Sequence, residues 1–123
     1  MYRTRGSQFV FACGFVALTA SAAAATTWNV PGDGSGTCTI VSPNCNTILA
    51  AYTASVNGDT IQVGAGVFPV TAQINLLKQL TIVGAGPAST TITPTTAGFS
   101  VRTSGIVIRD LRFQGGTTAI NFQ

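Results

Sequence analysis

From Gly58 onward the chain consists of short runs in which apolar and polar residues alternate. In each run, apolar residues two apart, such as Leu80 and Ile82, place one face of a strand toward a core. The pattern predicts nine strands, at 60–63, 67–70, 74–76, 80–83, 90–93, 99–101, 106–108, 111–113 and 119–122. Another short strand is expected at 27–30.

The nine strands form three groups of three. Ile61, Ile82 and Ile108 hold the same place in successive groups, and they are separated by 21 and then 26 residues. A repeat of about 20–30 residues with turns of variable length is typical of a solenoid. We therefore expect strands of successive groups to stack side by side in parallel.

The spacing of apolar residues also predicts a corner. Ile108 and Leu111 are three residues apart, so both can point inward only if the chain turns at Arg109-Asp110. A coil that turns three times per circuit needs such a corner. The expected fold is all-β: a right-handed parallel β-helix of about three coils, with the handedness taken from known solenoids.

A short helix is expected before the coils. The segment Cys45–Ala54 is the only credible helix, with Asn44 as its N-cap and Asn57-Gly58 ending it. We expect three larger side chains and one alanine on its buried face: Ile48, Leu49, Tyr52 and Ala51. The expected organisation is a leader at 1–25, an N-terminal cap with one short α-helix at 26–57 and β-helix coils at 58–123.

The first 25 residues have the pattern of a secretory signal. Arg3 and Arg5 precede the uncharged apolar run 9–18, and the small residues 20–25 follow it. The run is shorter than the roughly 20 residues that span a bilayer. We expect cleavage, with Ala25 favoured as the last residue removed; an uncleaved anchor is the alternative. The protein is then secreted, periplasmic or on the cell surface.

Export gives meaning to the two remaining cysteines. Cys38 and Cys45 are the only ones after the leader, and an oxidising compartment favours a disulfide between them. A zinc site is the rival interpretation. It would need further thiolate or imidazole ligands that the chain does not offer.

Composition narrows the possible chemistry. The chain has no His and only three acidic residues, all Asp, so histidine-based triads are excluded. After the leader, the chain has four basic and three acidic residues, which gives a net charge of +1. This balance does not indicate a nucleic-acid-binding surface.

Three segments carry a resemblance to a known superfamily. Residues 58–68 (GDTIQVGAGVF), 80–86 (LTIVGAG) and 106–113 (IVIRDLRF) resemble the coils of pectin-lyase-like right-handed β-helix proteins. The segment holding the two cysteines is similar to the CSLREA-type N-terminal segment of exported proteins, but Asn46-Thr47-Ile48-Leu49 replaces its core. The resemblance covers about residues 45–123. It implies the fold; the superfamily includes polysaccharide lyases, hydrolases, adhesins and non-enzymatic repeats.

Charged residues at the expected corner are the candidate binding site. Arg109, Asp110 and Arg112 could contact an acidic polysaccharide or cell-surface glycan; a solvated ion pair is the alternative. The calcium-binding acids of lyases and the Asp groups of hydrolases, which the resemblance would imply, have no counterpart here. We therefore expect no catalytic residue. Asp59, at a turn, is expected to accept hydrogen bonds from its own backbone neighbourhood.

Glycines punctuate the predicted coils. The segment from Gly84 to Ser89 imitates a dinucleotide-binding turn, but β-branched residues and a proline follow it where a helix would have to begin. We therefore expect no nucleotide cofactor. The glycines are interpreted as turn residues: Gly58, Gly64, Gly66, Gly84 and Gly86.

Three further residues have two interpretations each. Asp33 lies in a Gly-rich loop that offers one carboxylate against the about six to eight oxygens that calcium takes; a surface loop is expected, with calcium as the alternative. Trp28 either covers the N-terminal end of the core or stacks on a sugar. Asn121 is expected to point inward or lie at a corner, where it starts an asparagine ladder.

Two classes of function remain. The first is an exported structural or carbohydrate-binding β-helix module, non-catalytic as it stands. The alternative is the N-terminal part of a polysaccharide lyase or glycoside hydrolase whose catalytic coils lie beyond Gln123. In either case the last coil is expected to lie against further coils or another chain, because its strand edges are otherwise unpaired.

Overall fold

The computed structural model describes residues 24–123 of the chain. Apart from Ala24 and Ala25, the predicted leader lies outside the described residues.

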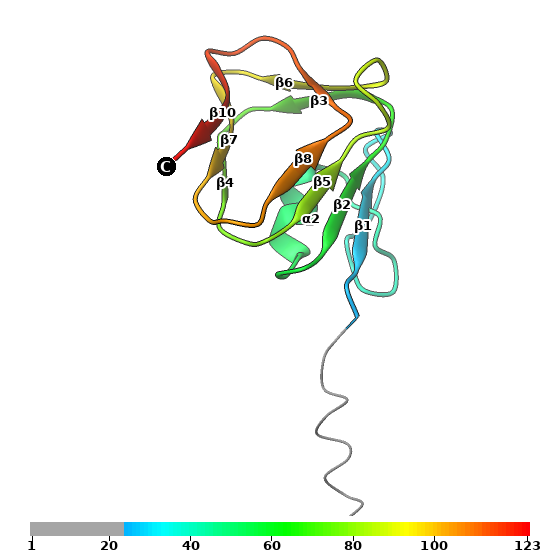
Figure 1. The fold of residues 1–123 in the computed structure, drawn as a ribbon. Coiled ribbons are helices and arrows are strands. Elements are labelled where there is room, and N and C mark those ends of the chain that lie inside the picture. The colour runs from blue at the N-terminus through cyan, green and yellow to red at the C-terminus, as the bar shows by residue number, and fades with distance from the viewer. Residues whose placement is uncertain (1–23) are drawn as a thin grey trace, which may run out of the picture.

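The described residues are mainly β-strand, with one short helix (Figure 1). The strands form parallel sheets, as every pairing between named strands is parallel. In chain order the elements are β1 (Thr27–Val30), α2 (Ile48–Ala54), β2 (Thr60–Val63), β3 (Gly66–Val70), β4 (Ile74–Leu76), β5 (Thr81–Val83), β6 (Thr90–Pro94), β7 (Ala97–Val101), β8 (Val107–Arg109), β9 (Arg112–Phe113) and β10 (Thr118–Phe122).

The chain visits three sheets in rotation. The sheet orders are β1-β2-β5-β8, β3-β6-β9 and β4-β7-β10. From β2 onward each strand therefore lies beside the strand three places later, as Figure 1 shows for β2, β5 and β8. The predicted equivalence of Ile61, Ile82 and Ile108 is confirmed, because these residues are register partners. All nine strands predicted after Gly58 are present, with shifts of one or two residues at their ends.

Inward side chains stack into apolar ladders. Ile61 and Ile82 are fully buried, as are Ile92 and Phe99. The ring of Phe99 meets that of Phe113 edge to face, with centroids 5.5 Å apart, a geometry that adds to the burial energy of the pair. The hydrophobic core therefore runs along the stack, enclosed by the three sheets.

The helix is shorter than predicted and has a different cap. Asn44 and Cys45 lie beside β1: Asn44 forms a parallel bridge with Asn29, and the Cys45 amide donates to the Asn29 carbonyl over 2.6 Å. These bonds hold the backbone extended. The helix begins three residues later than predicted, at Ile48, where the Thr47 hydroxyl accepts from the Ala50 amide over 3.0 Å.

The buried face of the helix also differs from the prediction. Ile48 and Ala51 are buried against the core, and Tyr52 is half-buried. Leu49, which we expected on the same face, is 52% exposed. The seven-residue helix has two turns, so only a narrow strip of it can face the sheets.

The predicted corner is present between β8 and β9. Asp110 has a φ of 60°, a left-handed conformation that is uncommon for a residue with a side chain. The amide of Gly86, in the preceding coil, donates to the Asp110 carbonyl over 2.9 Å. Ile108 and Leu111 both pack against the core on either side of this turn.

Candidate functional site

The end of the molecule at β1 is tied to the first coil by a buried carboxylate. Asp59 is 3% exposed and accepts three hydrogen bonds, each 2.9 Å long, from the amides of Thr26 and Val56 and from the indole Nε1 of Trp28. The expectation of purely local bonds was wrong, because two of the three donors lie more than 30 residues away in sequence. Asp59 therefore clamps β1 onto the start of β2.

Trp28 covers the N-terminal end of the core. Its side chain is 2% exposed, and its only polar atom is satisfied by Asp59. A buried ring offers no face to a ligand, so the alternative of sugar stacking is wrong.

The ionised form of Asp59 is favoured in the folded chain. Burial on its own raises the pKa of this carboxyl, but the three hydrogen bonds and the positive charge of Lys78 outweigh it, and the pKa lies below its ordinary value of 3.8. The pKa of Asp33 is also lowered, by hydrogen bonds from the side chain and amide of Ser35.

These directions predict that the chain loses stability in acid. A carboxyl with a depressed folded-state pKa contributes stability above its unfolded pKa of about 3.8, and the contribution disappears as the pH falls through the lower folded value. We expect the urea midpoint to be level from pH 7 to 5 and to fall below pH 4. Asp59→Asn should flatten this decline, whereas Asp33→Asn should retain most of it. An equal decline in Asp59→Asn and the native chain would contradict the prediction.

Lys78 caps the C-terminal end of helix α2. Its Nζ donates to the carbonyl oxygens of Tyr52 and Ser55, both at 2.7 Å, and to that of Thr53 at 3.3 Å. It also lies 4.6 Å from the centroid of the Tyr52 ring. Burial lowers the pKa of Lys78, and the charge of Asp59 opposes this effect. A cation is stabilising at a helix C-terminus. Because Lys78 follows strand β4 in the chain, its hydrogen bonds also join α2 to the segment after β4.

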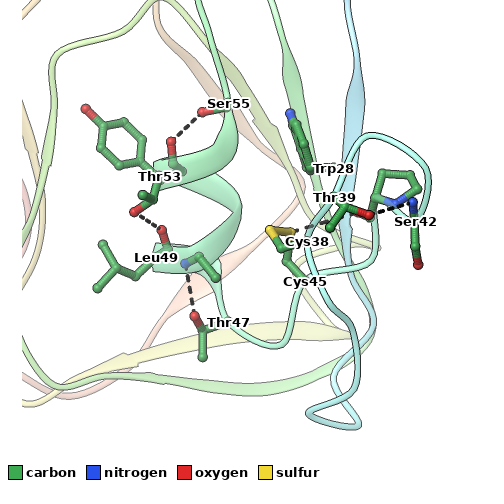
Figure 2. The surroundings of a disulfide bond; sticks show 12 residues. Trp28, Cys38, Thr39, Ser42, Cys45, Thr47, Leu49, Thr53 and Ser55 are labelled. Atoms are coloured by element: carbon green, nitrogen blue, oxygen red, sulfur yellow. Dashed lines mark hydrogen bonds between the residues drawn. A yellow bond between two sulfur atoms is a disulfide. The ribbon is translucent and has the colours of Figure 1, made fainter.

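The predicted disulfide between Cys38 and Cys45 is present. Figure 2 shows it next to α2, with Trp28 nearby. The seven-residue separation gives a small loop, for which the chain-entropy model indicates about 2–3 kcal/mol of stabilisation. It closes a loop within residues 26–57, whereas Asp59 and Lys78 join this segment to the strands that follow.

The candidate glycan contacts lie on the last coil. Arg109 ends β8, Arg112 begins β9, and Asp110 lies at the corner between them. Arg109 forms an ion pair with Asp110, with side chains 58% and 47% exposed. Arg112 donates to the Thr91 hydroxyl on the neighbouring strand over 3.1 Å. The structure thus brings the three residues together at an exposed corner, where each of their side chains has a partner within the chain.

A polar strip on the outer side of one sheet leads to this corner. Asn29, Gln62, Val83 and Arg109 are register partners along β1-β2-β5-β8. Adjacent members are therefore about 4.8 Å apart, the spacing of paired strands. Val83 interrupts the strip, because it is apolar and 8% exposed, and Gln62 Nε2 donates to its carbonyl oxygen over 3.3 Å. Sequence reasoning missed the strip, because Asn29 lies in the cap and its alignment with Gln62 depends on the pairing of β1.

The five predicted turn glycines lie between strands or at their ends. Gly58, Gly66 and Gly86 have positive φ values of 93°, 138° and 141°. Gly64 and Gly84 do not, and are required instead because neighbouring backbone approaches them closely. After Gly86 the chain continues into strand β6, as predicted, so the segment that imitates a dinucleotide-binding turn leads into a strand and not a helix.

The remaining candidates have structural partners within the chain. Asp33 Oδ1 accepts from the amide and hydroxyl of Ser35 in an exposed turn. Asn121 aligns with Ser100 and, through it, with Asn75. Ile120 and Phe122, on either side of Asn121, line an apolar hollow, so Asn121 points to the opposite, outer side of its sheet. Its partner Ser100 on that side is fully buried and accepts from Arg102 and Gln123. The expectation of an inward or corner position for Asn121 was therefore wrong.

Two shallow hollows flank the start of the helix. One, of about 140 Å³, lies between Thr47–Leu49 and the segment from Pro69 to Ile74. The other, of about 220 Å³, reaches toward Gly32 and Gly34. Neither is lined by a charged side chain, so their walls offer van der Waals contact and neutral hydrogen-bonding groups, among them the side chains of Thr47, Thr71 and Asn46.

Within residues 24–123, no helix is long and apolar enough to span a bilayer. In the same part of the chain, no three His, Cys, Asp or Glu side chains gather into a group that could hold a metal ion. Searches against known protein families, curated proteins and solved structures each gave no match.

Proposed function

We propose that this chain is an exported, non-catalytic β-helix module, right-handed and parallel, which serves a structural role and binds polysaccharide on its side. The observation that carries the proposal is the rotation of the chain through three parallel sheets with inward apolar ladders. Such a stack presents regular, flat outer faces and gains its stability from layer-on-layer contact.

The arrangement of the N-terminal segment supports the structural role. Solenoid cores need a cover at their ends. Here Trp28, Asp59, Lys78 and the disulfide hold residues 26–57 over one end of the core. The Cys38–Cys45 disulfide supports export, because disulfides persist in oxidising compartments.

The polar strip and the Arg corner support polysaccharide binding. Asn29 and Gln62 offer amide groups at strand spacing, and Arg109 adds a cation at the end of the strip. An extended polymer that crosses the strands could bond to Asn29, Gln62 and Arg109, and would pass over Val83 between the last two. The guanidinium groups of Arg109 and Arg112 match the carboxylates of an acidic sugar.

Binding to polygalacturonate, compared with a neutral glucan, tests this function. We expect the native chain to bind the acidic polymer, and the double change Arg109→Gln with Arg112→Gln to weaken binding about tenfold, from two exposed charge contacts. Arg102→Gln removes one positive charge from the segment after β7, away from the corner, and should have little effect. Equal binding by both variants would count against the corner as the site.

The same experiment tests the alternative of a lyase or hydrolase. Incubation with the acidic polymer should produce no unsaturated uronate absorbance and no new reducing ends. Turnover by the chain would replace the non-catalytic proposal with an enzymatic one.

A further inference from the structure

Among residues 24–123, Thr26 is the first whose backbone is bonded to a coil. Its amide donates to Asp59 Oδ1 over 2.9 Å, and its carbonyl accepts from the Thr60 amide over 3.0 Å. Strand β1 begins at the next residue. Ala24 and Ala25, which precede Thr26, are exposed and belong to no helix or strand. The part of the chain that the coils hold therefore starts at Thr26.

The carboxylate that receives the Thr26 amide is buried without a cation in direct contact. Asp59 is 3% exposed, and its three donors are neutral: the amides of Thr26 and Val56 and the indole of Trp28. The charge of Lys78 acts on Asp59, but the Nζ of Lys78 donates to carbonyl oxygens at the end of α2. The one ion pair within residues 24–123 lies elsewhere, at the corner after β8. Buried charges are normally paired with an opposite charge.

We propose that the leader is removed between Ala25 and Thr26, and that the α-ammonium group created there forms an ion pair with Asp59. The inference rests on the export in the proposed function. Hydrolysis adds one water: its oxygen joins the Ala25 carbonyl carbon to give a carboxylate, and both hydrogens go to the Thr26 nitrogen, which is positively charged at neutral pH. This nitrogen is already 2.9 Å from Oδ1 of Asp59, so the pair forms without a change in the fold.

The position of Thr26 distinguishes among the cleavage sites that the sequence permits. The small residues at 20–25 suit leader removal at more than one bond. Cleavage one or two residues earlier leaves exposed alanines and keeps the Thr26 nitrogen as a neutral amide. Cleavage after Ala25 converts the same hydrogen bond into a charge-assisted one, which is roughly twice as strong. Processing at this bond therefore strengthens the contact that holds β1 beside β2.

The mass of the exported product tests the cleavage site. The full chain, expressed for export and recovered oxidised, should give a single product with the mass of residues 26–123. A product that begins at Ala24 or Ala25 overturns the inference and leaves export intact. A chain that keeps its leader, or that is not exported, overturns the export in the proposed function as well.

A matched chain separates the new charge from the hydrogen bond. Insertion of one Ser between Ala25 and Thr26 retains the cleavage site, moves the ammonium about 3.8 Å along the chain and leaves Thr26 with a neutral amide. At pH 7 the unfolding equilibrium constant of this chain should be about three- to tenfold larger, the difference between a charged and a neutral hydrogen bond. Urea unfolding followed by Trp28 fluorescence gives both constants. Equal constants overturn the ion pair even where the mass confirms the cleavage.

The pH dependence of this difference identifies the amine. Pairing with Asp59 raises the pKa of the α-amine, so its stabilisation is complete below the ordinary pKa and disappears as the pH rises through the raised value. The two chains should therefore differ at pH 7 and converge in alkaline solution. Lys78, the other cation that acts on Asp59, is present in both chains and cancels in the comparison.

Asp59→Asn provides a second comparison. In this variant the inserted Ser should no longer change the unfolding constant at pH 7, whereas in Asp33→Asn it should change it as in the native chain. A difference that persists in Asp59→Asn overturns the ion pair. If Asp59→Asn does not fold, the alkaline comparison decides, because a difference that persists there also excludes the α-ammonium as its cause.

Discussion

Asp59→Ala should lower the free energy of unfolding by about 3–4 kcal/mol, because it leaves three donors buried or half-buried without their acceptor. Those donors are the amides of Thr26 and Val56 and the indole of Trp28. Water cannot replace the carboxylate without opening the contact between β1 and β2. The change also leaves Lys78 without the negative charge near it.

Urea unfolding monitored by tryptophan fluorescence measures this effect directly, because Trp28 is the only tryptophan in the chain. We expect a lower midpoint and, even before unfolding, emission shifted to the red as the indole gains water. Asp33→Ala is the matched control. It removes an exposed acid that bonds only to Ser35, and it should cost less than about 0.5 kcal/mol. Equal losses in the two variants would show that Asp59 does not clamp the cap.

The strands and their parallel pairing could be predicted from the sequence because their signal is local and repeated. Alternating apolar residues mark each strand, and the equal placement of Ile61, Ile82 and Ile108 predicts the pairing of one sheet. The corner at Asp110 followed from a single break in parity. Each of these inferences depends on residues close together in the chain or on one regular spacing.

The cap could not be predicted in the same way, because its interactions join distant residues. Nothing near Asp59 indicates that its partners are Thr26 and Trp28, and nothing near Lys78 indicates the carbonyls at the end of α2. The helix start was misplaced for the same reason. Asn44 has a good capping side chain, but pairing with Asn29 holds it in an extended conformation.

The candidate site was predicted in part. The sequence placed Arg109, Asp110 and Arg112 at one corner, and the structure does so too. It did not indicate that Arg112 bonds to Thr91 or that Asn29 and Gln62 lie in line with Arg109. Outer faces of sheets carry little sequence signal, since many polar residues are tolerated there.

The corner that carries the Arg residues is itself held by the turn of the preceding coil. The amide of Gly84 donates to the Arg109 carbonyl over 3.0 Å, and the amide of Gly86 donates to that of Asp110. A Cβ added at Gly84 would overlap the carbonyl oxygen of Asp110 and lie 2.8 Å from Cβ of Leu111. Both are backbone or near-backbone atoms, so no side-chain rotation can relieve the contact.

We therefore expect Gly84→Ala to destabilise the chain by about 3 kcal/mol, at the upper end of the cost of overpacking a core. Gly58→Ala is the control, because Gly58 has a positive φ but open space around it, and strain alone should cost about 1 kcal/mol. Gly86 has a φ of 141°, and a Cβ added there would lie 4.0 Å from Ser89 Oγ. Gly86→Ala should therefore resemble Gly58→Ala. Urea midpoints give the three values. A loss of stability in Gly84→Ala no larger than that in Gly58→Ala would contradict the close backbone contact at this corner. If the larger loss is found, Gly84→Ala should also weaken binding to polygalacturonate, because the displaced backbone carries Arg109.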